Sequence, residues 1–214
     1  ICGKPMIQHV WERCCLSVDR AKVFVATDDE RIKEAVQRFG GQVVMTSSEC
    51  LTGTDRLAEA NLQLNCDFIV NVQGDEPLIT PGDINTVINA FLRTGNVTNA
   101  MCPIVSEQEF RSYTVPKVTF SRSGRLLYMS RSCIPLTKSG EYRFGHKQVC
   151  IYAFSKEQLN FYHRNHAKTR HEEVEDIEIL RFLESDYTVD MVKLAVGSIA
   201  VDVPSDVDRV VSYI

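Results

Sequence analysis

Apolar and polar positions along the first half of the chain predict helices and strands in alternation. Met6, Val10 and Cys14 recur at helical spacing, and three short apolar runs are typical of buried strands. The sequence from Thr27 to Glu30 fits a helix capping box. Predicted strands lie at 23–26, 43–45 and 68–72, and predicted helices at 30–39, 54–64 and 81–91. Such a pattern indicates an α/β fold built on a mostly parallel sheet flanked by helices.

The pattern changes in the middle third of the chain. Apolar runs at 116–120 and 126–129 flank Ser121 to Gly124, which is typical of a β-hairpin turn. The remaining expected elements are a strand at 150–154, helices at 156–163 and 173–184, a strand at 187–192 and a last helix capped by Ser205. We therefore predict a single domain over residues 1–214, with an inserted antiparallel region at about 113–152.

Composition and charge exclude several classes of protein. The chain has 214 residues, of which 44% are hydrophobic, and a net charge of −4, which gives no general attraction for nucleic acid. No apolar run approaches the ~18 residues of a membrane span, so we expect no membrane partner. The eight cysteines include no Cys-x-x-Cys pair, which favours free thiols in the cytoplasm over disulfides or zinc. Ile1 to Met6 reads like the interior of a domain, so we expect a strand before it, outside this sequence.

A glycine turn with two carboxylates follows the predicted strand 68–72. Ligands in open α/β sheets bind beyond the carboxyl ends of strands, and Gly74 permits a tight turn there. Asp75 is then placed to bind Mg²⁺, which takes one or two carboxylates together with substrate phosphates. Asp202 ends another apolar segment and is the candidate second ligand. The alternative for residues 73–77 is a solvated turn without a function.

Three further segments admit both a structural and a functional interpretation. Residues 52–56 open a helix, so they either bind an anion or form an ordinary cap with Arg56 in a surface ion pair. Lys117 lies in an apolar strand and either points to solvent or reaches into the site. Arg131 offers a planar fork, which suits either a substrate carboxylate or phosphate or a structural ion pair.

The helix predicted at 173–184 carries two carboxylates three residues apart. Glu175 and Glu178 would share one helix face, which is usually solvated. Glu178 and Arg181 have the same spacing and are expected to pair.

Together, these segments resemble the 3-deoxy-manno-octulosonate (Kdo) cytidylyltransferase family. The matching stretches are Gly3 to Val10, Val25 to Asp29, Gly53 to Arg56, Asn71 to Pro77, Tyr128 to Arg131 with Ile134-Pro135, and Val201 to Pro204. They cover nearly the whole chain in the family's order, which is far more specific than any one motif. The resemblance implies a Rossmann-like nucleotidyltransferase fold that is usually dimeric through the inserted hairpin region. It also implies that the anomeric hydroxyl of a sugar acid attacks the α-phosphorus of CTP and releases pyrophosphate, in the synthesis of bacterial lipopolysaccharide.

The same resemblance implies roles for individual residues. Asp75 and Asp202 would hold Mg²⁺, and Lys117 and Arg131 would be catalytic residues facing the sugar acid. The nucleotide pocket would be formed by Thr52, Gly53, Thr54, Arg56, Gln73 and Gly74, with Gln73 near the ribose or the sugar. The acceptor would contact Gln148, Tyr152, Glu178 and Ile179. We therefore expect a magnesium-dependent, homodimeric, cytoplasmic enzyme whose substrates are CTP and a sugar acid.

Three departures from the family pattern bear on activity and substrate. The family's basic, glycine-containing nucleotide loop, which precedes the segment matching Gly3, is not within this sequence. Gln148 stands where the family usually has histidine, and Ile179 stands where it has glutamine. Both exchanges change hydrogen bonding near the acceptor, so a variant octulosonate or a nonulosonate is an alternative to Kdo. A sugar-phosphate or alditol-phosphate nucleotidyltransferase and a non-catalytic nucleotide-binding paralogue are the remaining alternatives.

Overall fold

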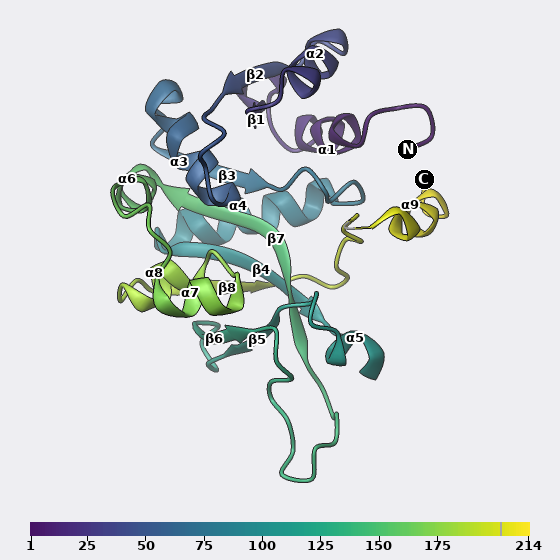
Figure 1. Ribbon diagram of the computed structural model, residues 1–214, viewed down its shortest axis with the longest axis vertical. Coiled ribbons are helices and arrows are strands. Elements are labelled where there is room, and N and C mark those ends of the chain that lie inside the picture. Colours follow the sequence, from purple (N-terminus) through teal and green to yellow (C-terminus); the bar gives the residue numbers. More distant parts are fainter. Residues whose placement is uncertain (202) are drawn as a thin grey trace.

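The computed structural model describes residues 1–201 and 203–214 (Figure 1). Its helices are α1 (Met6–Cys15), α2 (Glu30–Arg38), α3 (Gly53–Leu64), α4 (Pro81–Thr94), α5 (Glu107–Arg111), α6 (Lys156–Arg164), α7 (Arg170–Glu175), α8 (Leu180–Glu184) and α9 (Pro204–Val211), with a short 3₁₀ helix at Arg20–Lys22. Its strands are β1 (Phe24–Thr27), β2 (Gln42–Met45), β3 (Phe68–Val72), β4 (Val97–Pro103), β5 (Lys117–Phe120), β6 (Leu126–Ser130), β7 (His146–Ser155) and β8 (Val189–Lys193).

Two sheets form the scaffold. β1 pairs in parallel with β2, and a six-stranded sheet has the order β6-β5-β7-β4-β8, with β3 also paired to β7. The α/β fold is confirmed, but the larger sheet is mixed rather than mostly parallel. The long strand β7 runs antiparallel to β3, β4 and β5, whereas β4 and β8 are parallel. The inserted hairpin is the reason, because the chain leaves it in the opposite direction and β7 then crosses the centre of the sheet.

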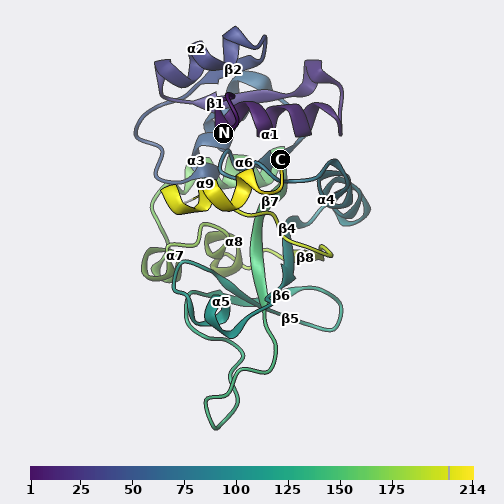
Figure 2. The same ribbon diagram turned by 90° about the vertical axis from the view of Figure 1, so that its right-hand side faces the viewer.

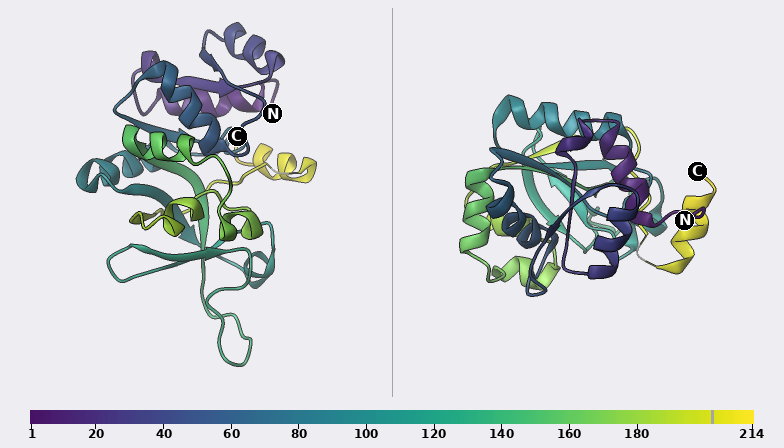
Figure 3. Two further views of the ribbon diagram at one scale, coloured as in Figure 1. Left: turned by 60° about the vertical axis from the view of Figure 1, so that its left-hand side comes forward. Right: turned by 90° about the horizontal axis from the view of Figure 1, so that it is seen from above.

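Helices cover both faces of the larger sheet (Figure 3). Along β7, Tyr152 and Phe154 belong to the core under α6 and α8, whereas Ile151 and Ala153 belong to the core under α4. Alternate side chains of a strand point to opposite faces, so one strand supplies both cores. The ring of Phe154 stacks on that of Phe182 from α8, with centroids 5.2 Å apart. This packing fixes α8 against β7.

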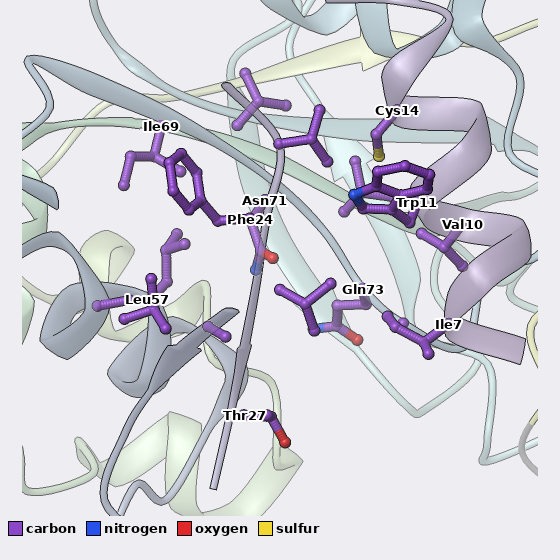
Figure 4. A pocket seen from close by; sticks show the side chains of 18 of the residues that line it. Ile7, Val10, Trp11, Cys14, Phe24, Thr27, Leu57, Ile69, Asn71 and Gln73 are labelled. Carbon is purple, nitrogen blue, oxygen red and sulfur yellow. The ribbon is translucent and has the colours of Figure 1, made fainter. Parts of the chain in front are cut away.

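An apolar cavity of about 1380 Å³ lies between β1 and β3. Its lining includes Ile7, Val10, Trp11 and Cys14 of α1, Phe24 of β1, Leu57 of α3, and Ile69 and Asn71 of β3 (Figure 4). Within the described residues β1 pairs only with β2 and β3 pairs only with β7, so each has one edge without a partner strand. Two buried donors in the lining, Trp11 Nε1 and Asn71 Nδ2, make no hydrogen bond in the described part of the chain.

The inserted region consists of β5, β6, a long loop and the beginning of β7. The hairpin of β5 and β6 is confirmed, and the loop at 131–145 projects away from the rest of the molecule (Figures 1 and 2). α9 lies beside the start of the chain in both views (Figures 1 and 2). The predicted role of the insertion in dimer formation stays a prediction. None of the described helices is both long and apolar enough to cross a bilayer.

Two further features differ from the sequence-based prediction. The central strand β4 was not predicted, although Val97 to Met101 and Cys102 are all buried. Thr98 and Asn99 are polar, so the segment lacks the continuous apolar run by which a buried strand is recognised in a sequence. The helix predicted at 173–184 is two helices, since Asp176 adopts a left-handed backbone (φ 52°) and ends α7.

Candidate active site

The turn after β3 meets the segment that leads into α9. The carbonyl of Asp75 accepts a 2.9 Å hydrogen bond from the N–H of Val201. Asp202, the other predicted metal ligand, lies outside the described residues, but its neighbour Val201 is held beside Asp75. Glu76 is only 3% exposed, and burial together with the nearby charge of Asp75 raises its pKa. The two segments predicted to form one metal site therefore lie side by side.

The carboxylates of this turn suit a hard divalent cation. Mg²⁺ prefers oxygen ligands, and Asp75 and Glu76 bring two carboxylates together at a strand end. A cation here would offset the repulsion that contributes to the raised pKa of Glu76. The donor set therefore fits Mg²⁺, with Asp75 as the candidate ligand within the described residues.

The N-terminus of α3 is held by its own cap and by a distant carboxylate. Thr52 is the N-cap, and its hydroxyl accepts a backbone N–H from the first turn. Glu178 Oε2 accepts the N–H of Thr54 at 2.9 Å, and Glu178 Oε1 accepts a hydrogen bond from Gln73 Nε2 at 3.1 Å. Gly53 permits this approach, since a Cβ there would lie 3.3 Å from Gln73 Nε2. One carboxylate thus joins the predicted nucleotide loop to the end of β3.

Glu178 begins a hydrogen-bonded chain that reaches the central strand β4. Its carboxylate interacts with the hydroxyl of Tyr152, and that hydroxyl accepts a hydrogen bond from Gln148 Nε2 at 3.1 Å. Gln148 Nε2 also donates to Asn99 Oδ1 at 3.0 Å, and Asn99 donates to two carbonyls of β7. Burial raises the pKa of both Glu178 and Tyr152. Three of the four predicted acceptor residues therefore belong to one network.

Arg56 lies where the lining of the cavity becomes polar. Its Nη1 donates to Thr46 Oγ1 at 2.7 Å and lies 3.1 Å from Asp28 Oδ1. At the carboxyl ends of β1 and β3, Thr27 and Gln73 line the cavity (Figure 4). Asp28, Gly74 and Gly53 belong to the same lining. The cavity is thus apolar along the strands and polar at their carboxyl ends, where open α/β sheets bind ligands.

Lys117 and Arg131 are engaged by backbone carbonyls. The Lys117 ammonium is buried and donates to carbonyls of the 112–115 loop and of Arg131, and burial lowers its pKa. Arg131 donates to the carbonyls of Glu175 at 2.6 Å and Asp176 at 3.0 Å, and to the 112–115 loop at 3.1 Å. Both were predicted to face the sugar acid. In the structure both donate to backbone carbonyls beside the inserted hairpin, and a contact with the sugar acid stays a prediction.

Comparison with known proteins places the chain in a family. Residues 1–191 match the family model described as Cytidylyltransferase. A Geobacter metallireducens protein named 3-deoxy-manno-octulosonate cytidylyltransferase is 42% identical over 99% of this chain and 88% of its own length. This chain belongs to the cytidylyltransferase family. The family resemblance inferred from the sequence motifs is therefore confirmed.

Two further proteins similar to this cytidylyltransferase have names that mention a sugar-acid acceptor or a bound nucleotide. A Shewanella baltica protein named 8-amino-3,8-dideoxy-manno-octulosonate cytidylyltransferase is 39% identical, over 97% of this chain and 86% of its own length. A solved structure of a CMP:2-keto-3-deoxy-manno-octonic acid synthetase complexed with CTP has a TM-score of 0.91 and 35% identity. It covers 100% of this chain and 88% of that one.

Two predictions for residues 175–179 of this cytidylyltransferase need correction. Ile179, predicted to contact the acceptor, is 1% exposed and packs in the hydrophobic core, so its side chain does not line an open site. Glu175 and Glu178 do not share a helix face, because Asp176 separates them. Glu175 instead accepts hydrogen bonds from Ser130 Oγ and from the Arg131 N–H, at 2.6 and 2.8 Å.

Sequence reasoning missed several polar residues beside the site. Asn99, Asp55 and Glu172 are buried, and each accepts a hydrogen bond within the networks around Glu178. Arg181 is also buried, and it pairs with Asp55 and Glu172 rather than with Glu178. Only Arg181 had a usable signal, as a charged residue inside the apolar run Ile179 to Leu183.

Proposed function

We propose that this protein transfers CMP from CTP to the anomeric hydroxyl of a 3-deoxy-2-ulosonic acid, with Kdo as the leading acceptor. The hydroxyl oxygen of the sugar acid forms a bond to the α-phosphorus of CTP. The bond between that phosphorus and the oxygen bridging to the β-phosphate breaks, pyrophosphate leaves, and the hydroxyl proton passes to solvent. The products are CMP-sugar acid and pyrophosphate.

The match to the CTP-complexed synthetase carries this proposal. It extends over the whole chain at 35% identity, and the Geobacter relative is 42% identical. The geometry agrees with it, because Gly53, Gln73 and Gly74 line one polar cavity end while Glu178 connects this end to Tyr152 and Gln148. A nucleotide at the cavity end and an acceptor along the Glu178 chain would therefore meet at the end of β3.

The residues of this chain contribute by positioning, since phosphoryl-type transfer needs little covalent help. Thr52 and Gly53 hold the start of α3 against the nucleotide, and Arg56 brings positive charge to the same cavity end. Glu178 binds both Gln73 Nε2 and the Thr54 N–H, and so fixes the distance between the end of β3 and the start of α3. Mg²⁺, when bound at Asp75 and Asp202, would supply charge neutralisation on the phosphates.

The 8-amino analogue of Kdo is the second candidate acceptor. The observation that favours it is Gln148, whose Nε2 is used by Asn99 and Tyr152 while its Oε1 makes no hydrogen bond in the described part of the chain. A protonated amine needs such an acceptor oxygen. The Shewanella relative, at 39% identity, is named for that substrate.

Pyrophosphate release from the full natural protein tests the function. We expect release only when CTP, Mg²⁺ and a Kdo-type acid are all present, and none with ATP, GTP or UTP in place of CTP. The panel of acceptors contains Kdo, its 8-amino analogue and a nonulosonate, and the fastest of them names the substrate. No release with any of the three would overturn the proposal.

Magnesium dependence, dimer formation and location complete the proposal. A chelator should abolish turnover, and added Mg²⁺ should restore it. The homodimer would form through the insertion at about 113–152, so a variant lacking residues 136–144 should elute as a monomer in size-exclusion chromatography with light scattering. We place the enzyme in the cytoplasm, where CTP is made, in a route to bacterial lipopolysaccharide.

A further inference from the structure

Arg181 is a charged residue in the interior of the protein. Its side chain is 0% exposed. The guanidinium carbon lies 3.7 Å from the centroid of the Tyr162 ring. Removing a charge from water is costly unless the charge is paired and hydrogen-bonded, and an apolar side chain of similar size would fill the same space more cheaply. The partners of Arg181 therefore indicate what this arginine does.

Two carboxylates from different helices satisfy Arg181. Its Nε and Nη2 donate to the two oxygens of Glu172 at 2.7 and 2.6 Å, which is the bidentate geometry of a strong pair. Its Nη1 donates to Asp55 Oδ1 at 3.0 Å. Burial lowers the pKa of Arg181, but the hydrogen bonds to Glu172 and Asp55 outweigh burial and raise the pKa above its ordinary value. Arg181 thus stays charged and ties α3 to α7 and α8.

The network reaches the candidate active site by two routes. Asp55 Oδ2 accepts a hydrogen bond from the hydroxyl of Thr52, the N-cap of α3, at 2.8 Å. The Tyr162 hydroxyl lies 3.1 Å from Glu172 Oε1, 3.4 Å from Thr52 Oγ1 and 3.4 Å from the carbonyl oxygen of Glu178. The same group of side chains therefore contacts both sides of the hydrogen bond between Glu178 and α3.

We propose that Asp55, Tyr162, Glu172 and Arg181 form a positioning network that sets the separation between the N-terminus of α3 and Glu178. The inference rests on the proposed function, in which α3 contacts CTP and Glu178 contacts the acceptor. The side chains of Arg181 and Glu172 are fully buried and out of reach of a bound substrate, so they would act through Thr52 and Glu178. Misplacing one reactant by ~1 Å lowers a transfer rate by as much as about 100-fold.

The first test is Tyr162→Phe, which removes the linking hydroxyl and keeps the ring against Arg181. We expect kcat for pyrophosphate release to fall about 10-fold, as one hydrogen bond is lost, with the Kd for CTP changed by less than about 3-fold. The matched control is Tyr187→Phe. Tyr187 packs on Phe182, as Tyr162 does, but its hydroxyl makes no hydrogen bond among the described residues. Its kcat should stay within about 2-fold of the wild type.

A second measurement separates positioning from stability. If the network acts as one unit, combining Tyr162→Phe with Thr52→Val should lower kcat by much less than the product of the single effects. A purely structural role would lower the melting temperature of Tyr162→Phe and leave kcat unchanged well below that temperature. Unchanged kcat, or fully multiplicative effects, would overturn the inference.

Hydrogen exchange of the Thr54 amide gives a readout without any substrate. The amide is held by Glu178, so its exchange should be about 10-fold faster in Tyr162→Phe and unchanged in Tyr187→Phe. If the wild type released no pyrophosphate, the proposed function would fail, and this exchange rate would still decide the positioning network. Equal exchange in the wild type and both variants would refute it.

Discussion

The two sides of α3 satisfy their polar groups in opposite ways. Toward α6, α7 and α8, the guanidinium of Arg181 is buried and each of its three nitrogens donates a hydrogen bond. Toward β1 and β3, the neighbour is an apolar cavity of about 1380 Å³. There, Trp11 Nε1 and Asn71 Nδ2 make no hydrogen bond within the described residues.

This contrast indicates which side of the site is held in place by contacts among the described residues alone, before any ligand binds. A fully bonded charged network resists displacement, because each broken bond leaves a buried polar group unpaired. Side chains around a cavity lack contacts across the gap and adapt more readily. We therefore expect the acceptor wall at Glu178 to be rigid, and the wall formed by β1 and β3 to gain order from whatever binds in the cavity.

The largest expected effect comes from breaking the charged side. Glu172→Gln keeps the shape of the side chain but removes the charge of the bidentate partner of Arg181. We expect the free energy of unfolding to fall by about 3 kcal/mol, because a buried cation loses its main counter-charge. Urea unfolding measures this loss. A loss of unfolding free energy below about 1 kcal/mol would show that the ion pairs of Arg181 do not stabilise this side of α3 more than surface ion pairs would.

A matched pair of valines compares packing on the two sides. Val97 in β4 is 0% exposed and lies in the main core, whereas Val25 in β1 lines the cavity. Val97→Ala should cost about 2 kcal/mol, and Val25→Ala about 1 kcal/mol, since fewer neighbours surround the methyl groups next to a gap. Equal losses of unfolding free energy for the two variants would contradict the difference in packing.

The unpaired amide of Asn71 gives a smaller effect of opposite sign. Asn71→Leu replaces a buried donor that has no partner among the described residues. We expect the unfolding free energy to be unchanged or to rise by up to about 1 kcal/mol, because the cost of burying the amide is relieved. Thermal unfolding of the ligand-free variant provides the check, with Asn99→Leu as the control that should be strongly destabilised. A clear loss in Asn71→Leu would mean that its amide is satisfied.

The smallest effect is a pH dependence at Glu178. Burial raises the pKa of Glu178 above its ordinary value of 4.5, so the folded protein keeps a proton that the unfolded chain releases. The contribution of this carboxyl group to stability therefore falls as pH rises from 4.5 through the raised pKa. Urea unfolding of wild type and Glu178→Gln across this interval should show the difference moving in favour of the variant. A difference that does not change with pH would argue against the raised pKa.

The sequence predicted the segments that bear local signals and missed those defined by tertiary contacts. Strand β3, the β5–β6 hairpin and the glycine turn at Gly74 follow from apolar runs and turn residues, and the structure confirms them. β4 was missed because buried Asn99 is polar, and its side-chain amide donates to a carbonyl of β7, 50 residues away along the chain. The break between α7 and α8 depends on the left-handed backbone of Asp176, for which the sequence holds no local signal.

The candidate site divides in the same way. Gln73 and Gly53, which belong to a strand-end and a glycine motif, are neighbours in the structure, and their role in binding the nucleotide stays a prediction. The family resemblance assigned Lys117 and Arg131 to the sugar acid, and that role stays a prediction. In the structure their N–H groups bind carbonyls that only the folded loop brings near. Charge in a sequence thus identifies a residue that needs a partner without telling which partner it has.

Pyrophosphate release by the full natural protein tests the central claim most directly. With CTP, Mg²⁺ and Kdo or its 8-amino analogue, the wild type should release one pyrophosphate for each CMP-sugar formed. Asp75→Asn should fold with the same melting temperature and lose at least about 100-fold in rate, since it removes a ligand charge at the phosphates. Release by Asp75→Asn at the wild-type rate, or no acceptor-dependent release by the wild type, would contradict a cytidylyl-transfer site at the end of β3.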